Sequence, residues 1–132
     1  MRGKFSSALL AGATVWCVGI IAAPLLHLPS VYQFFSLICH QDPARSWGLF
    51  GEPLPVCIRC ASIYFAFTAS LWLGFRTNVT WLRAALVFML CEFVFARVFV
   101  DAAALRSLSG IFVGWSAAPF VKEGVEELSD FL

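Results

Sequence analysis

Long apolar runs alternate with short polar connections along this chain. Residues 6–26 contain no charged side chain, and residues 56–75, 79–100 and 104–121 form three further runs in which apolar residues predominate. An α-helix rises 1.5 Å per residue, so about 20 apolar residues cross the hydrocarbon core of a bilayer. The pattern therefore predicts four transmembrane helices, and their short connections predict antiparallel neighbours.

A shorter helix is predicted after the first of these runs. Pro29 ends that run, and Ser30 followed by Gln33 matches a capping box, which marks a helix start. The helix expected at residues 30–40 carries apolar residues on one face and is too short to span a bilayer. We therefore expect it to lie at the membrane interface.

An irregular segment is predicted next. Pro43 prevents a long continuation of the short helix, and residues 47–55 contain two glycines and two prolines. This composition predicts a loop. The expected fold is therefore all-α: a four-helix transmembrane bundle with one interfacial helix and a cysteine-rich loop between the first two spans.

The composition supports a membrane protein. Hydrophobic residues make up 61% of the 132 residues and charged residues 13%, whereas a soluble domain has about 45–50% and about 25%. At this length we expect one integral membrane domain over residues 1–132, in the inner (cytoplasmic) membrane. The formal net charge is only +1, so nucleic acid is excluded as an expected partner.

The distribution of basic residues predicts the orientation. With four spans, both termini and the connection between the second and third helices lie on one side of the membrane. That side carries more Lys and Arg than the other, so both termini are expected in the cytoplasm and the cysteine loop outside. The two sets are Arg2, Lys4, Arg76, Arg83 and Lys122 against Arg45, Arg59 and Arg106.

Candidate chemistry gathers at the start of the second span. Cys57 and Cys60 are three residues apart, so they share one face of the first helical turn. The helix N-terminus and the charge of Arg59 both favour thiolate over thiol. Cys39, delivered by the preceding helix, would complete a cluster of three sulfur atoms. Thiolates bind metal ions and attack disulfides, so two functions remain open.

The first hypothesis is a metal site at one membrane face. Cys39, Cys57 and Cys60 would hold zinc or iron, and the fourth ligand would be His40, His27 or water. Adjacent helical residues point about 100° apart, so Cys39 and His40 reach one ion only if the helix has ended there.

The surroundings of this site are also predicted. Arg45 and Arg59 would balance the excess negative charge of the thiolates. Tyr64 falls one turn beyond Cys60 on the same face, where it could hydrogen-bond to the site. Tyrosine is equally common as an aromatic anchor at the membrane interface.

The second hypothesis is a membrane thiol oxidoreductase. Cys57 and Cys60 would form a dithiol/disulfide pair that exchanges with Cys39 or with a partner protein. A four-helix membrane protein with Cys-x-x-Cys at a helix mouth is similar to the quinone-linked disulfide-forming enzymes, which implies a quinone as electron acceptor. Those enzymes use two cysteine pairs, whereas here the remaining Cys17 and Cys91 lie inside predicted spans.

Three short motifs follow one another in and after the interfacial helix: Cys39-His40-Gln41, Arg45-Ser46 and Cys57-x-Arg59-Cys60-x-x-x-Tyr64. Their order resembles a family of small bacterial and archaeal membrane proteins of unknown function, with the signature Cys-His-Gln, Arg-Ser and Cys-x-Arg-Cys-x-Gly-x-Tyr. Ser62 stands where that signature has glycine. The resemblance covers residues 35–114 and implies that the cysteine group is a shared feature, but it brings no activity with it.

Charged residues within the third span form a separate candidate site. Glu92 lies near the middle of that span, where an ionisable group is costly and is by default a functional candidate. Arg97 is one candidate partner. Alternatively, Arg97 pairs with Asp101 along the helix, four residues on, and Glu92 is a structural hydrogen-bonding residue of the bundle.

Two glycines predict a close helix contact in the fourth span. Gly110 and Gly114 form a small-xxx-small pattern, which lets a neighbouring helix approach closely. A third hypothesis follows from it: the chain is an accessory subunit, or a homo-oligomer, that packs through this glycine face.

Overall fold

Helices make up most of the protein. The computed structural model describes residues 2–76, 78–99 and 102–131, and over these residues five α-helices and a two-stranded hairpin are present. The elements, in chain order, are α1 Arg2–Leu25, α2 Pro29–Ser36, a 3-10 turn Pro43–Arg45, β1 Gly48–Leu49, β2 Glu52–Pro53, α3 Ile58–Leu73, α4 Val79–Val98 and α5 Ala103–Phe131.

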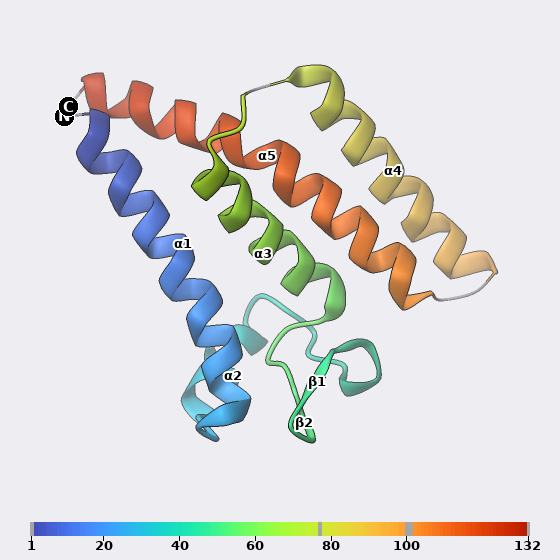
Figure 1. Ribbon diagram of the computed structural model, residues 1–132. Helices are drawn as coiled ribbons and strands as arrows, with labels where there is room; N and C mark the ends of the chain where they lie inside the picture. Colours follow the sequence, from blue (N-terminus) through green and yellow to red (C-terminus); the bar gives the residue numbers. More distant parts are fainter. Residues whose placement is uncertain (1, 77, 100–101, 132) are drawn as a thin grey trace.

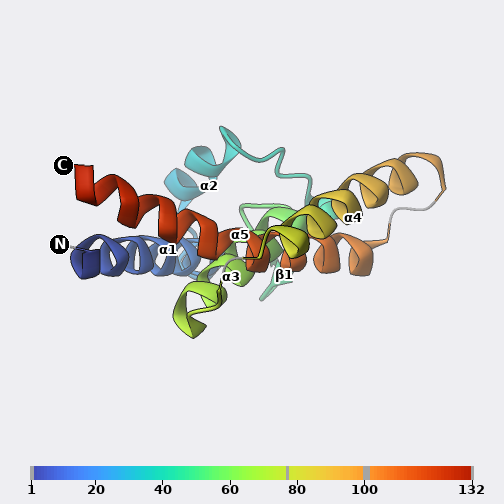
Figure 2. The ribbon, with the colours of Figure 1, turned by 90° about the horizontal axis from the view of Figure 1, so that it is seen from above.

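The four long helices run back and forth between two ends of the molecule (Figure 1). The termini and the α3–α4 connection lie at one end, and the cysteine-containing segment and the α4–α5 connection lie at the other. Seen from above, the N- and C-termini are again side by side (Figure 2). Helix α5 packs against α3, α4 and α1, so it is the element around which the others are arranged.

Two of the described helices are long and apolar enough to cross a membrane. They are Gly3–Leu25, which is most of α1, and Val79–Val98, which is α4. Helix α3 is apolar but has 16 residues, which corresponds to about 24 Å against a hydrocarbon core of about 30 Å. The left-handed conformation of Gly74 (φ 69°) ends it, because glycine tolerates this conformation at a helix C-terminus.

Several predicted boundaries differ from the structure. Helix α1 begins at Arg2 rather than at residue 6, and the last predicted residue of the third span, Val100, lies outside the described residues. Helix α2 begins after Leu28 with Pro29 in its first turn and no side-chain cap. The predicted cap at Ser30 was therefore wrong, because proline itself suits the first helical position, where no N–H is needed.

The segment predicted as an irregular loop contains a β-hairpin. Strands β1 and β2 are antiparallel, with Gly48 opposite Pro53 and Leu49 opposite Glu52. The turn between them has positive φ at both central residues, 52° at Phe50 and 87° at Gly51, which is the geometry that matches the twist of paired strands. The loop prediction was wrong because glycine and proline were taken only as residues that interrupt regular structure, whereas Gly51 here supplies the turn of a hairpin.

Helix α5 continues well beyond its predicted end at residue 121. It passes through Pro119 and ends at Phe131. Proline removes one backbone hydrogen bond from a helix but does not prevent its continuation when neighbouring contacts hold both halves. Here the final turns pack near α1, and Ser129 is buried and donates to the Glu126 carbonyl at 2.6 Å.

The glycine pair of α5 serves a contact within the chain. A Cβ atom on Gly110 would lie 2.7 Å from the Arg59 carbonyl oxygen and 2.8 Å from the Ser62 Cβ atom. A Cβ atom on Gly114 would overlap the carbonyl oxygen of Ile63. The close approach predicted from the small-xxx-small pattern is therefore made by α3. The hypothesis that this face binds a partner was wrong, because both glycines are buried against α3.

Gly114→Ala is expected to lower the free energy of unfolding by about 1–3 kcal/mol, because the added methyl group cannot be accommodated without moving α3. Gly124→Ala is the matched control, since it lies in the same helix and its Cβ would meet nothing within 4 Å. The control should be neutral or stabilising by up to about 1 kcal/mol. Thermal unfolding in detergent measures both, and equal shifts would contradict the assigned contact.

Candidate metal centre

Three cysteines from two parts of the fold meet at one end of the molecule. Cys39 lies in the turn after α2, Cys57 is the N-cap residue of α3, and Cys60 lies in the first turn of α3. Their ligating sulfur atoms lie within 4.8 Å of one another. Cys39 is 8% exposed and the other two are half-buried. The structure thus brings together the three sulfur atoms that the sequence grouped.

The segment that delivers Cys39 is held by side-chain hydrogen bonds. The Gln41 amide donates to the carbonyl oxygens of Tyr32 at 2.6 Å and Pro55 at 2.9 Å. The Tyr32 hydroxyl donates to the Pro53 carbonyl at 2.6 Å, which fastens the hairpin to α2. Gln41 itself has a positive φ of 47°, so the chain bends sharply just after the first cysteine.

Gln41 is a site residue that our sequence reasoning missed. It is the third residue of the Cys39-His40-Gln41 motif, and the sequence predicts no role for it. Its function is visible only in three dimensions, because it joins α2 to the strand that leads into α3. The only available signal in the sequence was its position next to Cys39 and His40.

The environment of Cys57 favours the thiolate. Its pKa is lowered to about 5, first by a hydrogen bond from the Cys60 thiol, then by the Cys60 backbone, the Cys39 side chain and the Arg59 backbone, while burial opposes this. Cys57 precedes the first residue of α3, so it faces the unpaired N–H groups of that helix. Its own N–H donates to the Cys39 sulfur at 3.1 Å.

The charged group of Arg59 pairs with a carboxylate on α4. Its guanidinium donates to the Glu92 carboxylate at 2.6 Å, and the Ser109 hydroxyl donates to the same oxygen at 3.3 Å. The Glu92 side chain is 2% exposed and that of Arg59 is 20% exposed. Glu92 therefore bonds to residues of α3 and α5. The predicted partner Arg97 was wrong, because Arg59 forms the ion pair with Glu92 across the α3–α4 interface.

Three other residues named from the sequence, His40, Arg45 and Arg97, line a cavity beside the cysteines. This cavity measures about 220 Å³, and its lining includes His40, Arg45, Arg97 and Cys57. His40 is exposed, and neither it nor His27 belongs to the cluster of ligating atoms. Its role as a fourth ligand stays a prediction.

The remaining predicted residues take structural positions. The Tyr64 ring packs edge-on against Trp16 with ring centroids 5.7 Å apart. The Cys17 sulfur is buried 3.2 Å from the Thr68 hydroxyl, and Cys91 is exposed on α4. All five cysteines lie within the described residues and are free thiols.

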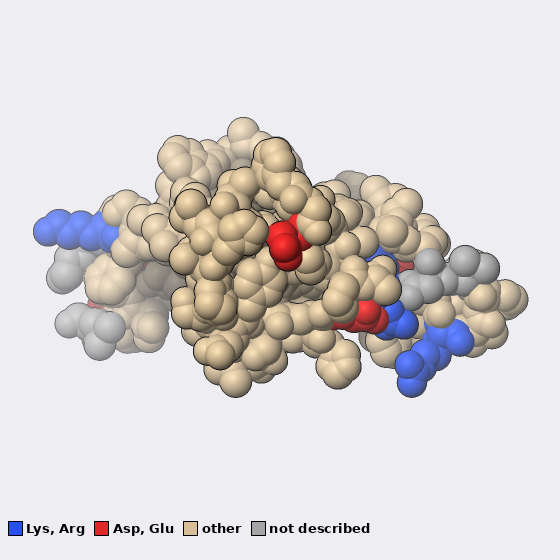
Figure 3. Space-filling model, turned by 90° about the horizontal axis from the view of Figure 1, so that it is seen from below, with Lys and Arg blue, Asp and Glu red and all other residues tan. Residues whose placement is uncertain are grey.

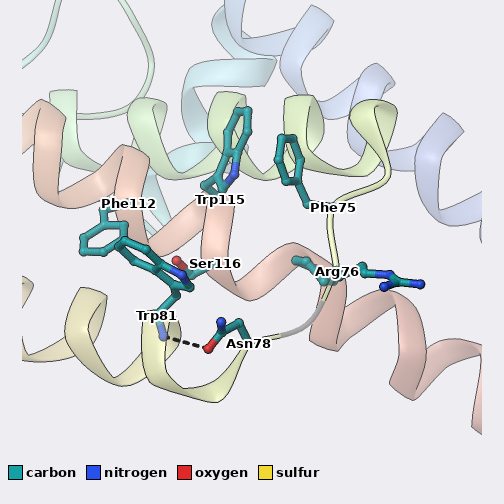
Figure 4. Close-up of a pocket in the computed structure, with 8 residues that line it drawn as sticks. Phe75, Arg76, Asn78, Trp81, Phe112, Trp115 and Ser116 are labelled. Carbon is teal, nitrogen blue, oxygen red and sulfur yellow. Dashed lines mark hydrogen bonds between the residues drawn. The ribbon is translucent and has the colours of Figure 1, made fainter.

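A second cavity, which the sequence did not suggest, lies beside the α3–α4 connection, at the opposite end of the molecule (Figure 1 and Figure 4). It measures about 630 Å³ and is lined by aromatic side chains from α4, α5 and the α3–α4 connection, with an arginine and an asparagine at one side. Phe75 and Trp115 lie next to each other, with ring centroids 4.5 Å apart. Tryptophan with nearby polar groups is typical of the headgroup region of a membrane.

Comparisons with known proteins place the chain in a family. The family model described as "Predicted membrane protein (DUF2085)" matches residues 39–120, which include all three clustered cysteines. The "Uncharacterized protein MJ1492" of Methanocaldococcus jannaschii is 53% identical over 34 residues, 26% of this chain and 22% of that relative. The match thus spans about a fifth of the relative's length. No solved structure matches.

Proposed function

This chain belongs to the DUF2085 family of membrane proteins, and we propose that it holds a metal ion, zinc or iron, on Cys39, Cys57 and Cys60. The observation that carries the proposal is the convergence of three sulfur atoms within 4.8 Å. A disulfide needs two of these atoms, whereas a thiolate metal site uses all three.

The donor set fits such an ion. Zinc binds thiolates at about 2.3 Å in tetrahedral geometry, which separates the sulfur atoms by about 3.8 Å. The three sulfur atoms lie within 4.8 Å of one another. The Cys57 N–H donates to the Cys39 sulfur, and the lowered pKa of Cys57 supplies a thiolate at neutral pH. His40, next to Cys39 in the chain, is the proposed fourth ligand.

A bound zinc ion acts as a structural clamp when four protein ligands surround it and as a Lewis acid when one position is open. Other residues of the chain hold the segments that carry the cysteines in place. Gln41 holds the turn that carries Cys39, and Arg59 anchors the first turn of α3 to α4 through Glu92.

We propose that four helices, α1, α3, α4 and α5, cross the inner membrane. The alternation of the helices between two ends supports it (Figure 1). Helix α3 packs extensively against α5 and also contacts α1, and a short hydrophobic helix is accommodated by local bilayer thinning. The excess of basic residues at the end that holds the termini supports a cytoplasmic location for that end.

A second candidate function is thiol–disulfide exchange by Cys57 and Cys60. The lowered pKa of Cys57 favours it, because an attacking thiol must be ionised near the working pH. This function would require a disulfide partner or a quinone to accept the electrons.

Elemental analysis by plasma mass spectrometry on detergent-purified protein separates the two functions when it is combined with a thiol count under denaturation. About one zinc or iron per chain, with all five cysteines reactive after denaturation, is expected for the metal site. Absence of metal together with two unreactive cysteines would overturn the metal proposal and establish the disulfide.

A further inference from the structure

Four arginines from different elements converge on the cavity beside the cysteines. This cavity of about 220 Å³ is lined by Arg45 of the 3-10 turn, Arg59 of α3, Arg97 of α4 and Arg106 of α5. His40 adds a fifth side chain that is able to donate hydrogen bonds. Like charges repel one another, so arginines that line one cavity favour an anion between them.

Two described carboxylates pair with two of these arginines. Asp42 lies 3.4 Å from Arg45, and Glu92 lies 2.6 Å from Arg59. Asp101, which follows α4, lies outside the described residues. Figure 3 shows basic and acidic side chains adjacent on the right half of the lower face, while most of the rest of that face is uncharged.

Arg59 also retains unused hydrogen-bonding capacity. Its Nε atom is buried and has no hydrogen-bond partner among the described residues, although its terminal nitrogen binds Glu92. Because a buried N–H without a partner is costly, this atom adds to the cost of placing Arg59 at the cavity wall.

We propose that this cavity binds a phosphate-type oxoanion, either free in solution or as the headgroup of a phospholipid. Guanidinium groups pair with phosphate oxygens through two parallel hydrogen bonds. A carboxylate presents two oxygens in one plane, which a single arginine satisfies. A tetrahedral phosphate presents oxygens in several directions, which suits arginines that arrive from four separate elements.

The cavity adjoins the cysteine cluster, because Cys57 belongs to the cluster and also lines the cavity. The oxoanion site nevertheless stands apart from the proposed metal, since its charge comes from arginines that bind no metal. Binding can therefore be measured on chelator-treated protein, and a failure of the metal proposal would leave this result unchanged.

The test is titration of inorganic phosphate into detergent-purified, chelator-treated protein, followed by calorimetry at low ionic strength. A parallel arm reconstitutes the protein in vesicles of phosphatidylglycerol or phosphatidylcholine and detects retained lipid by native mass spectrometry. Arg97→Gln is the principal variant, and Arg45→Gln on the exposed turn is the second, should the first fail to fold. Arg83→Gln is the matched control, because it is exposed on the same helix as Arg97 but does not line the cavity.

We expect the arginine variants to weaken binding by about tenfold, the loss typical of one charge-assisted hydrogen bond, and Arg83→Gln to leave it unchanged. Phosphate binding that shows this pattern identifies a free anion. Selective retention of phosphatidylglycerol with the same pattern identifies a lipid headgroup. Binding of neither ligand, or equal losses in Arg83→Gln and Arg97→Gln, would overturn the proposal.

Discussion

Cys60→Ser is expected to reduce the metal content of the purified protein from about one ion per chain to nearly none after a chelator wash. A serine hydroxyl does not ionise at neutral pH, so the substitution removes one of three charged ligands while changing the volume little. It also removes the thiol that donates to Cys57 and lowers its pKa. The remaining thiols should therefore hold metal far more weakly.

Cys91→Ser is the matched control for this experiment. Cys91 is exposed on α4 and does not belong to the cluster, so this variant should keep the metal content of the unmodified protein. Both variants are to be compared by circular dichroism before metal is measured. Equal metal in Cys60→Ser and in the unmodified protein would remove Cys60 from the ligand set.

Arg59→Met is expected to lower the free energy of unfolding by about 3–5 kcal/mol, because it leaves the Glu92 carboxylate buried without its partner. Replacing the other partner, Glu92, should lower the free energy of unfolding by less. Glu92→Leu leaves Arg59, whose side chain is 20% exposed and lines the cavity, so water can solvate the freed guanidinium. A loss of about 1–3 kcal/mol is expected there.

The double variant Arg59→Met/Glu92→Leu should be more stable than Arg59→Met alone, since no unpaired charge remains. Arg83→Met, an exposed residue on the same helix as Glu92, serves as control and should change stability by less than about 0.5 kcal/mol. Unfolding is to be followed in detergent with chelator present, which separates this effect from any metal. Losses that simply add in the double variant would show that the pair is not coupled.

The apolar runs determined the main helices, because an uninterrupted apolar segment has few alternatives to a helix in a membrane. Residues 79–98 are helical as predicted, and the family match confirms a membrane protein. The sequence also grouped Cys39, Cys57 and Cys60, since a three-residue spacing at a helix start and one nearby cysteine restrict the possible arrangements.

The tertiary structure decided which surfaces and charges meet. Whether Gly110 and Gly114 face a partner or a helix of the same chain cannot be read from their spacing, which is equally suited to both contacts. The choice between Arg59 and Arg97 as the partner of Glu92 depends on how α3 and α4 are placed around α5. These are long-range contacts, and local sequence patterns carry no information on them.

The sequence by itself therefore determined the membrane class, the main helices and the identity of the three clustered thiols. Only the tertiary structure decided the role of Gln41, the internal glycine contact and the arginine-lined cavity. The physical reason is that apolar length and helical spacing act over a few neighbouring residues. Hydrogen bonds and charge pairs between distant residues form only once the helices have packed.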